Sequence, residues 1–146
     1  MTKLNVLVAG STGYIGIQLI KLLIKHKNVK IKYLCGSSSV GKKMSFYDKT
    51  IKKKLPRISK LDKSKMNECD IIFTALPNGD AQRISNFLHK KNTLIDLSGD
   101  FRLNDAKSYL KSYKQKHKSV KNIKRSLYSL PELNQKNIKK YQIISC

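Results

Sequence analysis

The stretch Leu4–Gly16, LNVLVAGSTGYIG, decides the fold of this chain. Its first half, Leu4–Ala9, is a continuous apolar run of the kind that forms a strand buried inside a parallel sheet. Three glycines follow at regular three-residue spacing, Gly10, Gly13 and Gly16. Glycine permits a tight turn with positive φ and lets backbone N–H groups approach a phosphate. The stretch therefore predicts a strand, a phosphate-binding turn and a helix, which together begin a dinucleotide-binding unit.

The residues after the glycines predict the helix of this unit. Apolar side chains recur there at helical spacing and form one stripe, which consists of Ile15, Leu19, Ile20, Leu22, Leu23 and Ile24. The positive end of the helix dipole then faces the bound pyrophosphate. We expect the contacts with the pyrophosphate to come from Gly10, Ser11, Thr12, Gly13, Tyr14, Ile15 and Gly16.

The second predicted strand, Val29–Cys35, ends where such a domain meets the ribose of the adenosine. Sites that bind NAD commonly place an acid there, but no acid occurs between this strand and Tyr47. Hydroxyls and lysines take its place, at Ser37, Ser38, Ser39, Lys42 and Lys43. Hydroxyls and cations suit a 2′-phosphate, so the sequence favours NADP over NAD. The alternative is a polar loop with ordinary surface lysines.

Apolar runs alternate with helical patterns along the rest of the chain. Asp70–Leu76 and Thr93–Leu97 predict two further strands, and Gln142–Cys146 begins another. Helices are predicted between them, one with Ala81, Ile84, Phe87 and Leu88 on its apolar face, and one over Asp105–His117. Residues 45–65 predict loops around at most one short strand. This alternation is typical of an α/β fold, a Rossmann-type doubly wound parallel sheet.

The last part of the chain has a weaker pattern. Leu127–Leu133 is apolar and turn-prone, and Asn134 is expected to cap a short helix that runs through Tyr141. The chain stops within the last predicted strand. We therefore infer a truncated chain, in which residues 1–146 form one nucleotide-binding domain.

Two loops at strand ends carry further candidate site residues. The first loop, expected beside the nicotinamide end of the groove, contains Pro77, Asn78 and Gly79. The second, Ser98–Arg102, follows the next strand at the edge where open α/β sheets bind ligands. Asp100 and Arg102 are expected to face or support a substrate pocket, either as a pair or with Arg102 bound to a phosphate or carboxylate. A turn that only begins the next helix is the alternative.

The chain carries 31 Lys and Arg against 9 Asp and Glu, a formal net charge of +22. Such an excess raises the alternative of a nucleic-acid-binding domain. However, the charge is almost all lysine, is spread along the whole chain, and accompanies no zinc finger or aromatic RNA-binding motif. We therefore expect no specific nucleic-acid partner.

Cysteines and histidines offer no further chemistry. Cys35, Cys69 and Cys146 are odd in number and at no metal-ligand spacing, which predicts neither a metal site nor a disulfide framework and favours the reducing cytoplasm. We expect Cys35 and Cys69 to be small residues in the core or near the surface. Solvated positions are predicted for His26, His89 and His117. No run is apolar enough to predict a signal peptide or a membrane span.

Four segments in this order carry a family resemblance: Gly10–Gly16 (GSTGYIG), Leu76–Gly79 (LPNG), Ile95–Leu103 (IDLSGDFRL) and Tyr128–Asn134 (YSLPELN). Together they resemble the N-acetyl-gamma-glutamyl-phosphate reductase family, over essentially the whole chain. Aspartate-semialdehyde dehydrogenases share the fold and the first motif, but the last two segments are typical of the acetylglutamyl family. The resemblance implies that the chain is the nucleotide-binding half of such an enzyme.

In that family, NADPH reduces an acyl phosphate to an aldehyde through a cysteine thioester, as a step of arginine biosynthesis. The resemblance places the nucleophile about three residues beyond Cys146, so Cys146 is expected to neighbour it, with Cys146 itself as the alternative. The acid/base histidine belongs to a C-terminal half that the chain lacks. We therefore expect this chain to bind NADP(H) without turnover, and the whole protein to be a homo-oligomer.

Two other classes stay open. One is a different semialdehyde dehydrogenase, specific for aspartate semialdehyde or for the carrier-linked substrate of lysine biosynthesis. The other is a nucleotide-binding sensor that uses the same glycine loop without catalysis.

Overall fold

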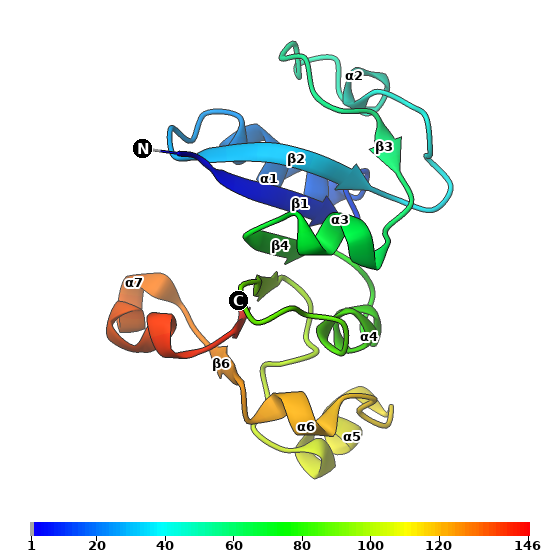
Figure 1. Ribbon diagram of the computed structural model, residues 1–146. Helices are drawn as coiled ribbons and strands as arrows, with labels where there is room; N and C mark the ends of the chain where they lie inside the picture. The colour runs from blue at the N-terminus through cyan, green and yellow to red at the C-terminus, as the bar shows by residue number, and fades with distance from the viewer. Residues whose placement is uncertain (1) are drawn as a thin grey trace.

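A parallel sheet forms the centre of the computed structural model, which describes residues 2–146 except for the side chains of residues 134–136. The sheet has seven strands in the order β3-β2-β1-β4-β5-β7-β6, and every neighbouring pair is parallel (Figure 1). The strands are β1 Leu4–Ala9, β2 Val29–Cys35, β3 Ile58–Ser59, β4 Ile71–Thr74, β5 Thr93–Asp96, β6 Ser126–Tyr128 and β7 Ile143–Ser145. The predicted Rossmann-type fold is therefore confirmed.

Short helices cover both faces of this sheet. They are α1 Tyr14–Leu23, α2 Met44–Tyr47, α3 Lys63–Asn67, α4 Asp80–Ser85, α5 Ala106–Tyr113, α6 Val120–Ile123 and α7 Pro131–Asn134, followed by a 3-10 helix over Gln135–Lys140. In Figure 1, α1 lies behind β1 and β2, whereas α3 lies in front of β4. Parallel sheets are covered in this way because crossover connections place helices on their faces.

Strand β1 is buried on both sides, and its alternate side chains separate two apolar cores. Val6 and Val8 join a cluster with side chains of α1 and α2, including Ile20. Leu7 and Ala9 join the opposite cluster with side chains of α3 and α4. This explains the continuous apolar run, because a central strand with helices on both faces has no polar side.

The order of the strands creates a switch point between β1 and β4. From β1 the chain builds outward to β2 and β3, and it then crosses to β4 on the other side of β1. The amide of Ala75 donates to the carbonyl of Ala9 (2.9 Å), which joins the two strand ends. Ligands of open α/β sheets bind outside the carboxyl ends of the strands at such a point.

Several predicted boundaries differ from the structure. Helix α4 ends at Ser85, so Phe87 and Leu88 of its predicted apolar face lie beyond it, and α5 ends at Tyr113 rather than at His117. Of the predicted apolar stripe of α1, Ile20 and Leu23 are buried, but Ile15 and Leu22 are exposed. One short strand, β3, lies within residues 45–65 as predicted, whereas β6 was not predicted. The side chain of Asn134, the expected helix cap, lies outside the described residues.

Cys35 and Cys69 are buried in the core, one of the two predicted positions, and the pKa of each thiol is raised to about 11 by burial. No group of three or more potential metal ligands occurs among the described residues. Within the same part of the chain, no helix has the length and apolar character needed to span a membrane.

Gly10 and Gly41 form a matched pair for testing the switch point. Both have positive φ, +81° and +84°, but a Cβ at Gly10 would lie 2.1 Å from the carbonyl oxygen of Ala75, whereas one at Gly41 would meet nothing within 4 Å. We expect Gly41→Ala to lower the free energy of unfolding by about 1 kcal/mol, through backbone strain alone. Gly10→Ala adds the clash and should cost roughly 3 kcal/mol or more. Urea unfolding of both variants measures the difference, and equal losses would contradict a packing role for Gly10.

Candidate nucleotide-binding site

The loop after β1 is fixed to the end of β2. The amides of Gly10 and Ser11 both donate to the carbonyl of Cys35, at 3.0 and 3.2 Å. The hydroxyl of Ser11 donates to the same carbonyl (3.1 Å), and its side chain is fully buried. A Cβ at Gly16 would lie 2.1 Å from the carbonyl oxygen of Gly10, so the first turn of α1 lies directly against the loop. The amides of Gly10 and Ser11 are thus used within the chain, and they hold the loop in a set position against the start of α1.

Helix α1 begins at this loop without a capping side chain. Its N-cap residue is Gly13, in an extended conformation, and its first turn contains no acid. Tyr14 and Ile15 are 82% and 51% exposed. The first N–H groups of a helix have no partner within the helix, and they carry the positive end of its dipole. This end of α1 can therefore bind an anion.

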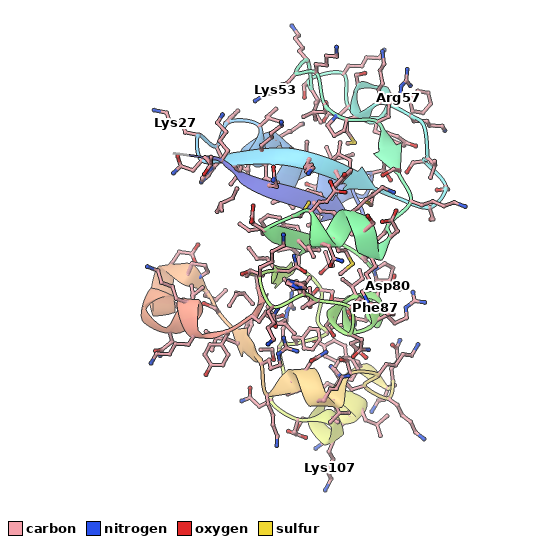
Figure 2. The ribbon with its side chains drawn as sticks, viewed as in Figure 1. Lys27, Lys53, Arg57, Asp80, Phe87 and Lys107 are labelled. Carbon is pink, nitrogen blue, oxygen red and sulfur yellow. The ribbon has the colours of Figure 1, made fainter. Side chains whose placement is uncertain are left out.

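A cleft of about 920 Å³ opens beside the loop, along the carboxyl ends of β1, β2 and β4. Its walls are the segment that leads into α3 on one side and α4 on the other. The apolar side chains that line it are Leu61, Met66, Leu76, Ile84 and Phe87. Figure 2 labels Asp80, the first residue of α4, and Phe87, which lies just beyond the end of this helix. Such a combination of apolar walls and a polar floor suits an aromatic ring that carries phosphates.

The charged side chains of the cleft come from the same two walls. They are Lys60, Asp62 and Lys63 on the α3 side, and Asp80 and Arg83 on the α4 side. Asp62 pairs with Lys65 (2.6 Å), and Asp80 pairs with Arg83. The hydrogen bond from Lys65 holds the pKa of Asp62 below its ordinary value.

The three predicted serines occupy different environments. Ser37 lines the cleft and Ser38 is exposed. Ser39 is 2% exposed, and a Cβ at Gly36 would lie 2.3 Å from its hydroxyl, so Ser39 is covered by the chain at Gly36. The structure therefore brings Ser37 to the cleft and keeps Ser39 away from it.

The cleft residues on α3 and α4 were not found from the sequence. Strand β3, which leads to Lys60, has only two residues and is too short to show a periodic pattern. The sequence predicted Phe87 on an apolar helix face, but Phe87 lies beyond the end of α4 and is 54% exposed at the cleft. Lys42 and Lys43, which the sequence favoured, do not line the cleft.

The loops after β4 and β5 hold each other in place. The carboxylate of Asp100, 1% exposed, accepts hydrogen bonds from the amide of Gly79 (2.8 Å), from the Gln82 side chain (2.8 Å) and from the Tyr109 hydroxyl (2.8 Å). In return, the amide of Gly99 donates to Asn78 Oδ1 (3.0 Å). Asp100 thus sets the N-terminus of α4 and the position of residues 77–79.

Asp100 and Arg102 do not form the ion pair that was one of the predicted alternatives. Asp100 is buried under the loop at residues 77–79, because its carboxylate accepts hydrogen bonds at the N-terminus of α4. The exposed Arg102 donates from Nε (3.2 Å) and Nη2 (2.9 Å) to the carbonyl of Cys146. Asp100 therefore has a structural role beneath the loop at residues 77–79, and Arg102 lies at the edge of the site.

Cys146 lies at the end of β7, where its amide donates to the carbonyl of Asp96 (2.9 Å). Burial raises the pKa of its thiol above the ordinary value, and the nearby Asp96 adds to this effect. Only the thiolate is an effective nucleophile, so this environment does not activate Cys146.

Asp96, which the sequence did not single out, is fully buried next to these loops. Burial raises its pKa, although its Oδ1 accepts hydrogen bonds from the hydroxyls of Thr74 (3.0 Å) and Ser98 (2.7 Å). Its carboxyl group therefore links the ends of β4 and β5 below the site.

His117 is buried rather than solvated, so that prediction was wrong. It is 8% exposed, and its ring lies against Tyr109 and Phe101, with centroids 4.9 and 5.3 Å away. Its Nδ1 accepts from the amide of Ser119 (3.1 Å), so Nε2 carries the proton and donates to the carbonyl of Asp100 (2.9 Å). His117 is buried because α5 ends earlier than predicted. The chain turns back at Lys114, which has a positive φ of 57°, and the ring of His117 then packs against Tyr109.

These features define a Rossmann-type dinucleotide-binding domain. A family model, the NAD-binding domain of semialdehyde dehydrogenases, matches residues 5–141. The chain belongs to this family.

Curated relatives agree with this assignment. N-acetyl-gamma-glutamyl-phosphate reductases of Ehrlichia ruminantium and Thermoanaerobacter pseudethanolicus are 37% and 39% identical to the chain, over 99% and 94% of its length. A Nitrosopumilus maritimus protein described as a LysW-L-2-aminoadipate/LysW-L-glutamate phosphate reductase is 35% identical over 95%. The chain spans 40–42% of the length of these relatives.

Solved structures show the same fold. The structure of aspartate semialdehyde dehydrogenase II of Vibrio cholerae in complex with ASA has a TM-score of 0.64 and 19% identity to the chain. The match covers 99% of this chain and 38% of the Vibrio cholerae chain. The structure of aspartate semialdehyde dehydrogenase of Candida albicans, solved with NADP, has a TM-score of 0.53 and 19% identity to the chain. The match covers 99% of this chain and 42% of the Candida albicans chain.

Asp100 can be tested against Asp105, an exposed aspartate that accepts from the amide of Ser108 (2.8 Å) as the N-cap of α5. We expect Asp100→Asn to lower the free energy of unfolding by about 3 kcal/mol, because an amide nitrogen replaces an acceptor in a buried site. Asparagine is as good an N-cap as aspartate, so Asp105→Asn should cost roughly 0.5 kcal/mol or less. Chemical denaturation measures both, and a small loss in Asp100→Asn would contradict its role in holding the two loops.

His117 should make stability depend on pH. Burial lowers its pKa from the ordinary 6.5, so the unfolded chain takes up a proton at a higher pH than the folded one. The stability due to neutral His117 is present above the unfolded pKa and is lost as the pH falls toward the folded pKa. We expect the free energy of unfolding to fall below about pH 6.5, less steeply in His117→Gln. His26→Gln, at an exposed position, is the control, and it should keep the slope of the unmodified chain.

Proposed function

We propose that this chain is the nucleotide-binding part of an NADP-dependent N-acetyl-gamma-glutamyl-phosphate reductase. Such an enzyme converts N-acetylglutamyl 5-phosphate to the 5-semialdehyde, with release of phosphate, in arginine biosynthesis. The observation that carries the proposal is the cleft at the switch point, which is lined by Gly10, the first residue of the glycine loop that leads into the uncapped α1. Relatives that are 34–39% identical to the chain and carry this name support the choice of reaction.

The residues around the cleft fit an NADP molecule. Gly10–Gly16 would hold the pyrophosphate at the start of α1, because the first N–H groups of this uncapped helix have no partner within the helix. Leu61 and Phe87 would contact the adenine from opposite walls. When bound, NADPH supplies the hydride for the reduction.

The other predicted contacts follow the same geometry. Ser37 and Ser38 would reach the 2′-phosphate, whereas the buried Ser39 would support the chain beneath them. Pro77 and Asn78 are exposed at the end of β4, where the nicotinamide would lie, and Gly79 is held beneath them by Asp100. These side chains would position the cofactor and exclude water from it.

Substrate chemistry would take place at the ends of β5 and β7. Arg102 is exposed there next to Cys146, and its guanidinium suits the phosphate of an acyl phosphate. We propose that Cys146 neighbours the nucleophile rather than acts as one, because its thiol is not activated. The chain described here would then bind NADPH without turnover. We further propose a cytoplasmic homo-oligomer as the form of the whole protein, with no specific nucleic-acid partner.

A LysW-linked phosphate reductase is the second candidate. The relative from Nitrosopumilus maritimus supports it, at 35% identity over 95% of the chain. The net charge of +22 also favours contact with an acidic carrier protein. Phosphate-dependent oxidation assays of the whole protein separate the two candidates. Activity on N-acetylglutamate semialdehyde alone would support the first, and activity only on the carrier-linked aldehyde would support the second.

Ile15 and Leu22 allow a test of anion binding at α1. Both side chains are exposed, 51% and 68%, but Ile15 lies in the first turn and Leu22 near the other end of the helix. We expect Ile15→Glu to weaken NADPH binding about tenfold, because the new carboxylate lies next to the pyrophosphate. Leu22→Glu should leave binding unchanged. Fluorescence titration with NADPH measures both, and thermal unfolding checks that each variant is folded. Equal affinities would contradict the proposed pyrophosphate site.

A further inference from the structure

The cleft has two kinds of charged side chain. Both of its acids are neutralised, Asp62 by Lys65 and Asp80 by Arg83. Lys60 and Lys63 take part in no salt bridge within the part of the chain that the structure describes. The unpaired charge of the cleft is therefore positive and lies on the segment between β3 and α3.

Pairing of β2 with β3 brings Ser37 and Lys60 to the same cleft. Cys35 is the register partner of Ser59, and the amide of Gly36 donates to the carbonyl of Ser59 (3.1 Å). Both strands end at this point. Lys60 directly follows Ser59, Ser37 lies two residues beyond Cys35, and both line the cleft. A hydroxyl and an ammonium group from neighbouring strand ends are thus brought to the wall beside the glycine loop.

The backbone of Lys60 is held while its side chain remains available. Its carbonyl accepts a hydrogen bond from Nζ of Lys65 (2.6 Å), and Asp62 accepts one from the amide of Lys65 (2.9 Å) at the start of α3. The Lys60 side chain is exposed. A positioned backbone with an unpaired ammonium group suits recognition of an anion.

The lysines that the sequence favoured are carried away from this position. The loop after Ser39 folds onto β3, because the amide of Gly41 donates to the carbonyl of Ile58 (2.8 Å) and the amide of Ile58 to that of Lys42 (3.0 Å). The ammonium group of Lys42 lies over the ring of Phe46, 4.7 Å from its centroid. Lys42 is therefore occupied outside the cleft.

We propose that Lys60, with Ser37, binds the 2′-phosphate of NADP(H) and sets the preference for NADP over NAD. The inference rests on the proposed function, because it assumes that the cleft holds the adenosine. The 2′-phosphate is the one group that distinguishes the two cofactors, and it presents a doubly charged acceptor to an ammonium and a hydroxyl donor. No acid stands at the end of β2 to accept a hydrogen bond from a ribose hydroxyl of NAD. The ammonium group of Lys60 and the hydroxyl of Ser37 therefore account for the difference in affinity between NADP and NAD.

The test compares NADPH and NADH binding to the chain with Lys60→Gln, Lys60→Arg and Lys42→Gln. Fluorescence titrations at physiological ionic strength give the dissociation constants, and adenosine 2′,5′-bisphosphate against AMP repeats the comparison without the nicotinamide. We expect the unmodified chain to prefer NADPH, and Lys60→Gln to weaken NADPH about tenfold while NADH is unaffected. Lys60→Arg should retain the preference for NADPH, and Lys42→Gln should behave as the unmodified chain.

The other outcomes separate the inference from the proposed function. If the chain prefers NADPH and Lys60→Gln binds it equally well, the role of Lys60 is wrong and the proposed function stands. An equal loss for both cofactors, or a loss in Lys42→Gln as large as in Lys60→Gln, also overturns the role. If the unmodified chain binds neither cofactor, the proposed function fails and the inference fails with it.

Discussion

The close approach of two backbone segments at Gly10 is the constraint on which the rest of the structure depends. A Cβ at this position would lie 2.1 Å from the carbonyl oxygen of Ala75, so β1 and β4 can end side by side only because residue 10 has no side chain. The hydrogen bond from Ala75 to Ala9 then joins the two ends. The cleft opens at this junction, and α1 begins beside it without a cap. The absence of a side chain at Gly10 thus permits both the close approach of β1 and β4 and the turn that leads into α1.

A second layer of contacts positions the loops around the cleft. Asp100 is buried and accepts hydrogen bonds from Gly79, Gln82 and Tyr109, while His117 donates to its backbone carbonyl. A buried carboxylate with this many donors is costly to disturb, because any lost partner leaves a buried acceptor unsatisfied. The exposed loop residues of the site are therefore held in place by buried polar contacts that lie beneath the surface a ligand would meet.

Most of the positive charge lies away from the cleft. Lys27, Lys53, Arg57 and Lys107 extend from widely separated parts of the surface in Figure 2. Within the cleft, by contrast, two acids each pair with a base, and Lys60 and Lys63 remain. The net charge of +22 therefore says little about which nucleotide the cleft binds, whereas the local pairing of charges is informative.

The sequence by itself determined the fold class and the glycine loop, because the apolar run Leu4–Ala9 and the spacing of three glycines are local patterns that have few other structural meanings. It also located the loops that follow β4 and β5. Only the tertiary structure decided that Asp100 caps α4, that His117 is buried, and that Lys60 rather than Lys42 faces the cleft. These outcomes depend on contacts between residues far apart in the chain, and on β3, a strand of two residues whose partner is chosen by the sheet and not by its own pattern.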